Sequence, residues 1–239
     1  MQLKDATVLV VDDEPQYCEI MSEWLLREGC RVLAANRGAQ ALELAEKNKI
    51  NAVVTDIRMP VMDGAEVVRR LKAKGTYTPC AVAVTGFSDL SPREAYDLGI
   101  EAQLAKPVER KVLISAVSRT LKEREELWAE PFRTTPLSTV AVQFASLAAA
   151  IRARQIAFGR GGFCMKSENS HPEESSVAFE LNFAGDGQTI SGQGIVRWSD
   201  TAEKLAGIEI TRVGDPGRAW VVGLAQKNPT VSFIPRSPA

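Results

Sequence analysis

The stretch Ala52-Val53-Val54-Thr55-Asp56-Ile57-Arg58-Met59-Pro60-Val61-Met62-Asp63-Gly64 decides the fold of the first half of the chain. It begins with an apolar, β-branched run that is typical of a strand buried inside a parallel sheet. Asp56 follows this run directly, and Pro60 and Gly64 mark the loop after it. A carboxylate therefore stands at the carboxyl end of a buried strand, where open α/β sheets place their ligand crevice.

A second apolar run, Thr7–Val11, is followed directly by Asp12 and Asp13. Like charges brought close together are costly to ionise unless a cation joins them. Oxygen ligands with room for water suit Mg²⁺. The two strand ends together predict a magnesium-assisted phosphoryl acceptor.

Apolar runs and amphipathic stretches alternate through the first half. The expected strands are Thr7–Val11, Arg31–Ala35, Ala52–Thr55, Cys80–Thr85 and Ala102–Ala105. The expected helices are Pro15–Glu28, Ala39–Asn48, Ala65–Lys74, a short helix capped by Ser91 and Glu94, and a helix from Glu109 onward. Five strand–helix units in about 120 residues predict an α/β doubly wound parallel five-stranded sheet.

The apolar face of the last helix continues from Val112 to Trp128, past the expected edge of the domain. Such a helix either packs its tail on the next domain or is a signalling helix that dimerises or couples domains, and the spacing does not choose between these roles. After a Pro-flanked break at 131–136, the stripe from Leu137 to about Gln155 predicts a further amphipathic helix.

Beyond this point the pattern changes to short strands and polar turns. The candidate strands are 161–165, Val177–Phe183, Thr189–Trp198 and Ala206–Ile210. They predict a small antiparallel β-barrel. The tail from Asn228, which contains three prolines, is expected to be loose.

The bulk composition narrows the function classes. The chain has 239 residues, enough for two domains, and a formal net charge of -1, so no global basic field draws it to nucleic acid or anionic lipid. Its four scattered cysteines are expected to be reduced thiols of a cytoplasmic protein. We see neither a signal peptide nor an apolar stretch of the ~20 residues that a membrane helix needs.

Two further polar residues stand at strand ends. Thr85 ends the fourth expected strand and Lys106 follows the fifth. A hydroxyl and an ammonium that converge on carboxylates are what a phosphoryl oxygen needs once it is attached to Asp56. Asp56 would be the nucleophile of an aspartyl-phosphate chemistry.

These residues resemble the receiver domain of bacterial two-component response regulators. The resemblance rests on Val10–Glu14, on Asp56–Pro60 with Asp63-Gly64, on Val84-Thr85-Gly86 and on Lys106-Pro107. It implies phosphorylation of Asp56 by a partner histidine kinase or phosphotransfer protein. It also implies Mg²⁺ bound by Asp12 or Asp13, Asp56 and the carbonyl of Arg58, with Thr85 and Lys106 contacting the phosphoryl group.

One position departs from the family pattern. Receivers usually carry Phe or Tyr three residues before the lysine, and this chain has Gln103. With Gln103 at this position, phosphorylation of Asp56 is still expected. The usual mechanism, in which the threonine and the aromatic ring move together and carry the signal to the outer face, is in doubt.

The second half lacks the signatures of common output classes. We find no helix-turn-helix pattern with basic positions, so DNA binding is not expected, and no catalytic constellation, so the chain is not expected to be an enzyme. His171, the one histidine, lies in a polar stretch and is expected on a loop surface.

Residues from about 137 to 225 resemble the PilZ family of small β-barrels, through Gly161-Gly162-Phe163, Gly192–Trp198 and Ala206–Ile210. Many PilZ domains bind cyclic di-GMP through RxxxR and D/NxSxxG motifs. When the second motif is aligned on Gly162, Ala157 and Gly159 replace its polar residues. A remodelled site of Arg152, Arg154 and Arg160 is the alternative to a barrel without the nucleotide.

The expected organisation is a receiver at 1–125, a helical connector at 126–155, a PilZ-like barrel at 156–228 and a loose tail at 229–239. The expected function is that of a phosphorelay response regulator whose output acts by protein interaction, or by homo-oligomerisation through the long helices. The alternative is a phosphorylation-gated cyclic di-GMP receptor.

Overall fold

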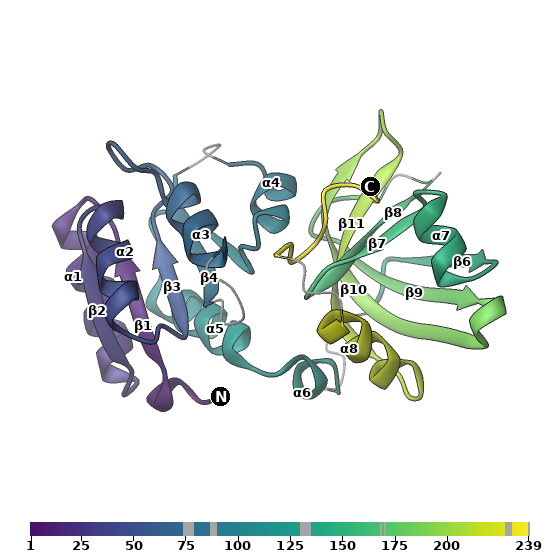
Figure 1. Ribbon diagram of the computed structural model, residues 1–239, viewed down its shortest axis with the longest axis horizontal. Helices are drawn as coiled ribbons and strands as arrows, with labels where there is room; N and C mark the ends of the chain where they lie inside the picture. The colour runs from purple at the N-terminus through teal and green to yellow at the C-terminus, as the bar shows by residue number, and fades with distance from the viewer. Residues whose placement is uncertain are drawn as a thin grey trace. The chain divides into compact units, whose positions relative to one another are not determined.

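The computed structural model describes residues 1–73, 79–86, 90–129, 135–167, 169, 171–227 and 231–238, with the side chains of 226 and 227 excepted. The chain forms two compact units, Met1–Lys122 and Glu123–Ala239 (Figure 1). Each unit has its own hydrophobic core.

The first unit is a five-stranded parallel sheet in the order β2-β1-β3-β4-β5. Its strands are β1 (Thr7–Val11), β2 (Arg31–Ala35), β3 (Ala52–Thr55), β4 (Cys80–Thr85) and β5 (Ala102–Ala105). Its helices are the 3-10 turn η1 (Leu3–Asp5), α1 (Pro15–Arg27), α2 (Gly38–Lys47), α3 (Gly64–Ala73), α4 (Pro92–Asp97) and α5 (Arg110–Leu121). The predicted doubly wound sheet is confirmed.

The two faces of this sheet carry separate apolar cores because successive strand residues point to opposite sides. Leu9, Val53 and Ala81 pack with residues of α2, α3 and α4 on one face. Val10 and Val54 pack with residues of α1 and α5 on the other. The helices therefore cover both faces and leave the carboxyl ends of the strands for the polar residues.

The second unit is built on a curled, mixed six-stranded sheet in the order β6-β9-β10-β11-β8-β7, which forms a half-barrel (Figure 1). Its strands are β6 (Ser138–Phe144), β7 (Ile156–Phe158), β8 (Gly162–Lys166), β9 (Ser176–Phe183), β10 (Gln188–Asp200) and β11 (Leu205–Val213). Its helices are α6 (Arg124–Ala129), α7 (Leu147–Arg152), the 3-10 turn η2 (Ala184–Asp186) and α8 (Gly217–Lys227). The β-rich second domain is confirmed, as an open sheet in which β6 runs parallel to β9 and the other pairs are antiparallel.

The expected helix from Leu137 to Gln155 is wrong over most of its length. Residues Ser138–Phe144 form β6, and only Leu147–Arg152 is helical. The apolar residues fit both a helical period and a period of two. Val140 and Phe144 are buried, whereas the odd-numbered residues Thr139, Ala141 and Gln143 are exposed, as in a strand with one buried face. Pairing with β9 decides for the strand.

The expected long helix past Glu109 is also wrong. The helix α5 ends at Leu121, Lys122 is extended with φ -70° and ψ 144°, and α6 begins at Arg124. Leu121 belongs to the core of the first unit, whereas Trp128 belongs to the core of the second. The apolar stripe is divided between the cores of the two units. Within the described residues it therefore does not form the single long helix that could pair with the same helix of a second copy.

The tail is packed rather than loose over its described part, residues 231–238. Phe233 and Ile234 are buried, and the ring of Phe233 lies 4.9 Å from the guanidinium of Arg124. The backbone N–H groups of Arg160 and Gly161 donate to the carbonyls of residues 232 and 233 at 3.0 and 2.9 Å. Burial of the apolar side chains of Phe233 and Ile234 stabilises the packed tail.

His171 is buried, with 4% of its surface exposed, so the expected surface position is wrong. Its Nε2 lies 3.0 Å from the hydroxyl of Ser167, and its Nδ1 lies 3.5 Å from that of Ser138. The hydroxyls satisfy the neutral ring, which explains how a polar residue in a polar stretch enters the interior.

Burial lowers the pKa of His171 below its ordinary value of 6.5. Below that pH the unfolded chain binds a proton that the folded chain resists, so stability falls as pH drops from the unfolded pKa toward the folded one. We expect His171→Gln to flatten this part of the pH profile of the second unit's unfolding. Urea titrations of both proteins between pH 7.5 and 5 measure it; parallel pH profiles for the two proteins would contradict it.

Candidate functional site

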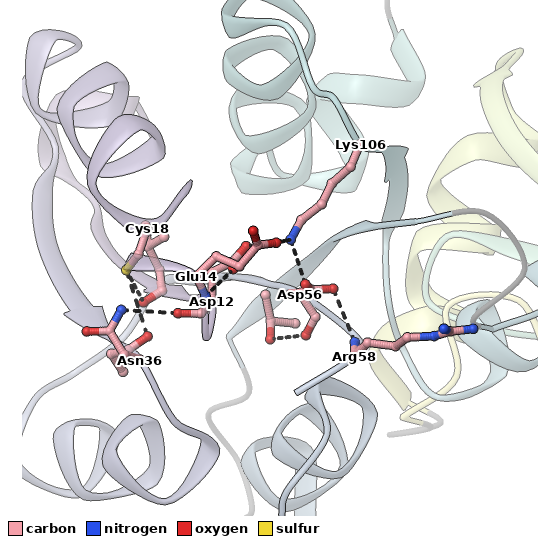
Figure 2. A network of polar contacts seen from close by, with 10 residues as sticks. Asp12, Glu14, Cys18, Asn36, Asp56, Arg58 and Lys106 are labelled. Carbon is pink, nitrogen blue, oxygen red and sulfur yellow. Dashed lines mark hydrogen bonds and ion pairs between the residues drawn. The ribbon is translucent and has the colours of Figure 1, made fainter. Parts of the chain in front are cut away.

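The carboxyl ends of β1, β3 and β5 bring the predicted acidic residues and the lysine together. Asp12 and Asp13 follow β1, Asp56 follows β3, and Lys106 follows β5. Figure 2 shows Lys106 reaching toward Asp56, with Asp12 beside them. One carboxylate oxygen of each of the three aspartates lies within 4.8 Å of the others. Sequence order alone separates these residues widely, and the parallel sheet places them at one edge.

Lys106 is the cationic centre of this cluster. Its Nζ lies 2.6 Å from Oδ2 of Asp56, 3.0 Å from Oδ2 of Asp12 and 3.5 Å from Oε1 of Glu14. The ammonium also lies 4.6 Å from the centre of the Tyr17 ring. Glu14 and Tyr17 were not predicted as site residues; Glu14 directly follows the acidic pair, and Tyr17 carries no signal in the sequence.

Backbone groups hold the two buried carboxylates in place. Oδ1 of Asp56 accepts the N–H of Arg58 at 3.1 Å, and Oδ1 of Asp12 accepts the N–H of Glu14 at 3.0 Å (Figure 2). The side chain of Asn36 donates to the carbonyl of Asp12 at 3.2 Å. These bonds fix the direction of the carboxylates, so the site is preorganised by the turns that follow the strands.

Burial and the charges of the site together shift the pKa values of Asp12 and Lys106. Burial raises the pKa of Asp12, and the Asp56 carboxylate adds to this, while Lys106 opposes it. Burial alone would lower the pKa of Lys106, but the Asp56 and Asp12 carboxylates outweigh it and hold that pKa above its usual value. Lys106 is therefore a permanent cation beside Asp56.

The acidic cluster fits a hard divalent cation. Oδ2 of Asp12 is fully buried and forms an ion pair with Lys106 by distance, but it has no hydrogen-bond donor of good geometry among the described residues. Together with the carboxylates of Asp13 and Asp56, this oxygen makes a ligand set of oxygen atoms only. Mg²⁺ prefers such ligands. The acidic triad is typical of the magnesium site of a receiver domain.

Gly64 packs directly against the backbone of Asp56 at the end of the acidic loop. A Cβ at this position would lie 1.8 Å from the carbonyl oxygen of Asp56 and 2.8 Å from the hydroxyl of Thr55. The N–H of Gly64 donates to the carbonyl of Ile57 at 2.9 Å. Only a residue without a side chain lets α3 begin this close to the acidic loop.

Thr85 ends β4 and lines a cavity of about 410 Å³, which Gln103 also lines. The amide of Gln103 donates to the carbonyl of Leu90 at 2.9 Å. Gln103 therefore ties β5 to the segment before α4 by a hydrogen bond that a phenylalanine at this position could not donate.

The three candidate arginines lie in the second unit. Arg152 ends α7, Arg154 follows it with φ +52°, and Arg160 lies in the turn between β7 and β8. Nε of Arg160 donates to the carbonyl of Val231 at 3.2 Å. A cavity of about 280 Å³ beside it includes Arg124, Glu123 and Glu125 among its described lining residues, and neither Arg152 nor Arg154.

Fold and site together define a known domain class. The sequence model of the response regulator receiver domain matches residues 8–118. This part of the chain is a response regulator receiver domain, and a β-rich half-barrel domain follows it. No helix in the described part of the chain has the length and apolar character needed to span a bilayer.

Several curated proteins and solved structures are similar to this chain. It is 36% identical over 118 residues to the transcriptional regulatory protein PrrA of Mycobacterium tuberculosis, covering 49% of this chain and 50% of that protein. It is 27% identical over 192 residues to the transcriptional regulatory protein GlrR of Escherichia coli, covering 76% of this chain and 43% of that protein. The chemotaxis response regulator CheY4 of Vibrio cholerae is 30% identical with a TM-score of 0.45, over 48% of this chain and 98% of that one. The chain thus spans about half the length, or less, of these two curated relatives.

Proposed function

We propose that the protein is a phosphorelay response regulator in which Asp56 accepts a phosphoryl group from a histidine kinase or phosphotransfer protein. One observation carries this proposal: three carboxylates converge at the end of the sheet, and the Lys106 ammonium lies 2.6 Å from Asp56. The receiver domain implies a kinase partner. We further propose that the protein is cytoplasmic and has no enzyme activity of its own.

In the transfer, an oxygen of Asp56 forms a bond to phosphorus while the bond from phosphorus to the donor histidine nitrogen breaks. The donor ring, which carries a proton on its other nitrogen, leaves as neutral imidazole. Lys106, already paired with Asp56, neutralises the phosphoryl oxygens as they arrive. Thr85 supplies a hydroxyl from the end of the neighbouring strand.

Asp12, Asp13, Asp56 and the carbonyl of Arg58 are the groups that would hold Mg²⁺. When bound, the ion supplies positive charge that offsets the phosphoryl oxygens and the crowded carboxylates. Lys106 faces three carboxylates by itself, so a bound Mg²⁺ would supply the second positive charge that the added phosphoryl group calls for.

Labelling with radioactive acetyl phosphate and Mg²⁺ tests the acceptor. We expect wild type to be labelled and Asp56→Ala to show only background, because the nucleophile is gone. Asp5→Ala, a change of the same kind in η1, should be labelled like wild type. Equal labelling of Asp56→Ala and wild type would exclude Asp56 as the acceptor.

For the output, we propose that the half-barrel domain acts through protein interaction or self-association, in the manner of a PilZ-like module without its nucleotide. The absence of polar side chains at Ala157 and Gly159 supports this choice. Light scattering with and without beryllofluoride, a phosphoryl mimic, tests whether phosphorylation changes the size of the particle. An unchanged particle would leave interaction with another protein as the output.

The second candidate is a cyclic di-GMP receptor gated by phosphorylation. It is favoured by the cavity beside Arg160, which a second guanidinium, that of Arg124, also lines. Glu123 and Glu125 in the same lining disfavour a dianion. Calorimetry with cyclic di-GMP decides: tight binding that is lost in the Arg152, Arg154 and Arg160 triple-alanine variant would replace the interaction proposal.

A further inference from the structure

The strand β6 forms one edge of the half-barrel sheet. It pairs with β9 at seven successive positions, from Ser138 opposite Val177 to Phe144 opposite Phe183. The sheet order gives β6 no second neighbouring strand in the part of the chain that the structure describes. Such an edge is a template on which another strand can pair.

The direction of the backbone groups follows from one hydrogen bond. The N–H of Leu137 donates to the carbonyl of Ser176 at 2.7 Å, so the odd-numbered residues of this segment turn their backbone groups toward β9. Because these directions alternate along a strand, the N–H and C=O groups of Ser138, Val140 and Val142 point away from β9. They form the edge that a further strand would meet.

The side chains of β6 do not protect this edge. Natural edge strands are usually blunted by charges, prolines, bulges or short length. The sequence Ser138–Phe144 contains no charged residue, no proline and no glycine, and it pairs without a bulge. The opposite edge, β7, is only three residues long.

The neighbouring helix leaves the outward side of β6 uncovered. Ala150 of α7 belongs to the same buried cluster as Val140 and Phe144, so α7 packs on the core side. Thr139, Ala141 and Gln143 are exposed on the other side. Leu137, directly before the strand, is 71% exposed, which is unusual for a leucine beside a sheet edge.

We propose that β6 pairs antiparallel with β6 of a second copy of this chain, about a two-fold axis at Ala141. This register uses all seven residues and places Thr139 opposite Gln143, Val140 opposite Val142, and Leu137 opposite Ala145. A second copy suits this edge because the neutral strand puts no like charges opposite each other and only small side chains at the axis. The contact is isologous and closes after two copies. This inference rests on the proposed output by self-association and names its surface.

The strength of the pairing fits a conditional contact. An edge of seven residues buries less area than a standard stable interface, so β6 alone is expected to pair weakly. If phosphorylation makes two receivers associate, the two β6 strands attached to them are held near each other. Their effective concentration then rises, and the weak β6 contact can form. The β6 pair is therefore expected to form with beryllofluoride present and to be sparse without it.

Cysteine cross-linking of the full chain tests the axis. Across an antiparallel non-hydrogen-bonded pair the Cα atoms lie about 4.5 Å apart, within the range that a disulfide spans. Ala141→Cys, with Mg²⁺ and beryllofluoride, should give a disulfide-linked dimer under mild oxidation. The control Glu180→Cys is exposed on the same side, one strand inward, where the two copies of the residue would lie about 14 Å apart given the spacing of strands. Ala141→Cys should cross-link at least tenfold faster than Glu180→Cys or wild type.

Two further variants test the register and the fold. A mixture of Thr139→Cys and Gln143→Cys should cross-link as a heterodimer, whereas Thr139→Cys alone should not. Ala141→Lys, an exposed change that leaves the core intact, places two ammonium groups opposite each other at the axis. It should weaken the dimer that beryllofluoride induces, as measured by light scattering at falling protein concentration.

The outcomes separate this inference from the proposed function. If wild type dimerises with beryllofluoride but Ala141→Cys cross-links no faster than Glu180→Cys, β6 pairing is overturned and self-association stands. If wild type stays monomeric by light scattering and no variant cross-links, both are overturned. Labelling of Asp56 is independent of either result.

Discussion

Gly64→Ala should both destabilise the receiver domain and slow phosphorylation of Asp56. The added Cβ would meet the backbone carbonyl of Asp56 at 1.8 Å, and backbone atoms cannot step aside as a flexible side chain can. Overpacking of this kind costs about 3 kcal/mol of the free energy of unfolding. Displacement of the Asp56 loop by about 1 Å should slow acetyl phosphate labelling by about 100-fold.

Calorimetry and labelling measure these two effects. The receiver transition is identified as the one that beryllofluoride and Mg²⁺ shift upward, since a ligand of the folded state stabilises it. Gly223→Ala is the control: a Cβ there meets nothing within 4 Å, and alanine suits a helix better by about 0.5–1 kcal/mol. A Gly64→Ala protein with the wild-type melting temperature and labelling rate would refute the role of Gly64.

Glu101→Ala should be the most destabilising single change at a position away from the acidic site. Glu101 and Lys72 form an ion pair at 3.5 Å, and both side chains are almost wholly buried. Glu101 also accepts the backbone N–H of Ala81 in β4. Removing the carboxylate takes the counter-charge of this ion pair from a buried ammonium and an acceptor from the N–H of Ala81, which costs about 3–5 kcal/mol of the free energy of unfolding.

The same calorimetric transition reports this loss. The double variant Lys72→Met with Glu101→Leu should recover much of it, because apolar replacement of both charges removes the desolvation penalty. Glu66→Ala removes an ion pair with Arg69 and Arg70 at the surface and should change the transition little, since solvent screens such pairs. Glu101→Ala with unchanged stability would mean that the pair is dispensable.

Much of the first unit could be predicted because its signals are local. Each strand is a short apolar run, and the five observed strands of the receiver sheet have the predicted bounds. The capping box of Ser91 and Glu94 was predicted from two residues and is present at the start of α4. Aspartates that directly follow such runs lie at the carboxyl edge of a parallel sheet by topology alone.

The site's cationic side was harder to predict in detail. Lys106 was found from its place after β5, but its contacts with Glu14 and Tyr17 depend on where α1 begins. A first-turn tyrosine has no pattern that indicates an ammonium above its ring. Side chains that meet across elements are decided by packing, which spacing along the chain does not encode.

Residues 138–144 show why the second unit was harder. The residues Leu137, Val140, Phe144 and Leu147 follow a helical period, while Val140, Val142 and Phe144 also follow a period of two. The free edge of β9 gives the strand its partner, and that edge lies about 40 residues further along the chain. The helix prediction failed because the competing partner is remote.

The sequence by itself determined the receiver fold, the Asp56 loop and the lysine opposite it, because these follow from local runs and the residues that end them. Tertiary structure decided that the apolar stripe past Leu121 is shared by two cores, that β6 is an edge strand, and that Phe233 and His171 are buried. The physical reason is the same in each case. An apolar side chain is buried against, and a backbone N–H or C=O group is hydrogen-bonded to, the groups that the folded chain brings next to it. In these cases those groups come from residues far away in the sequence.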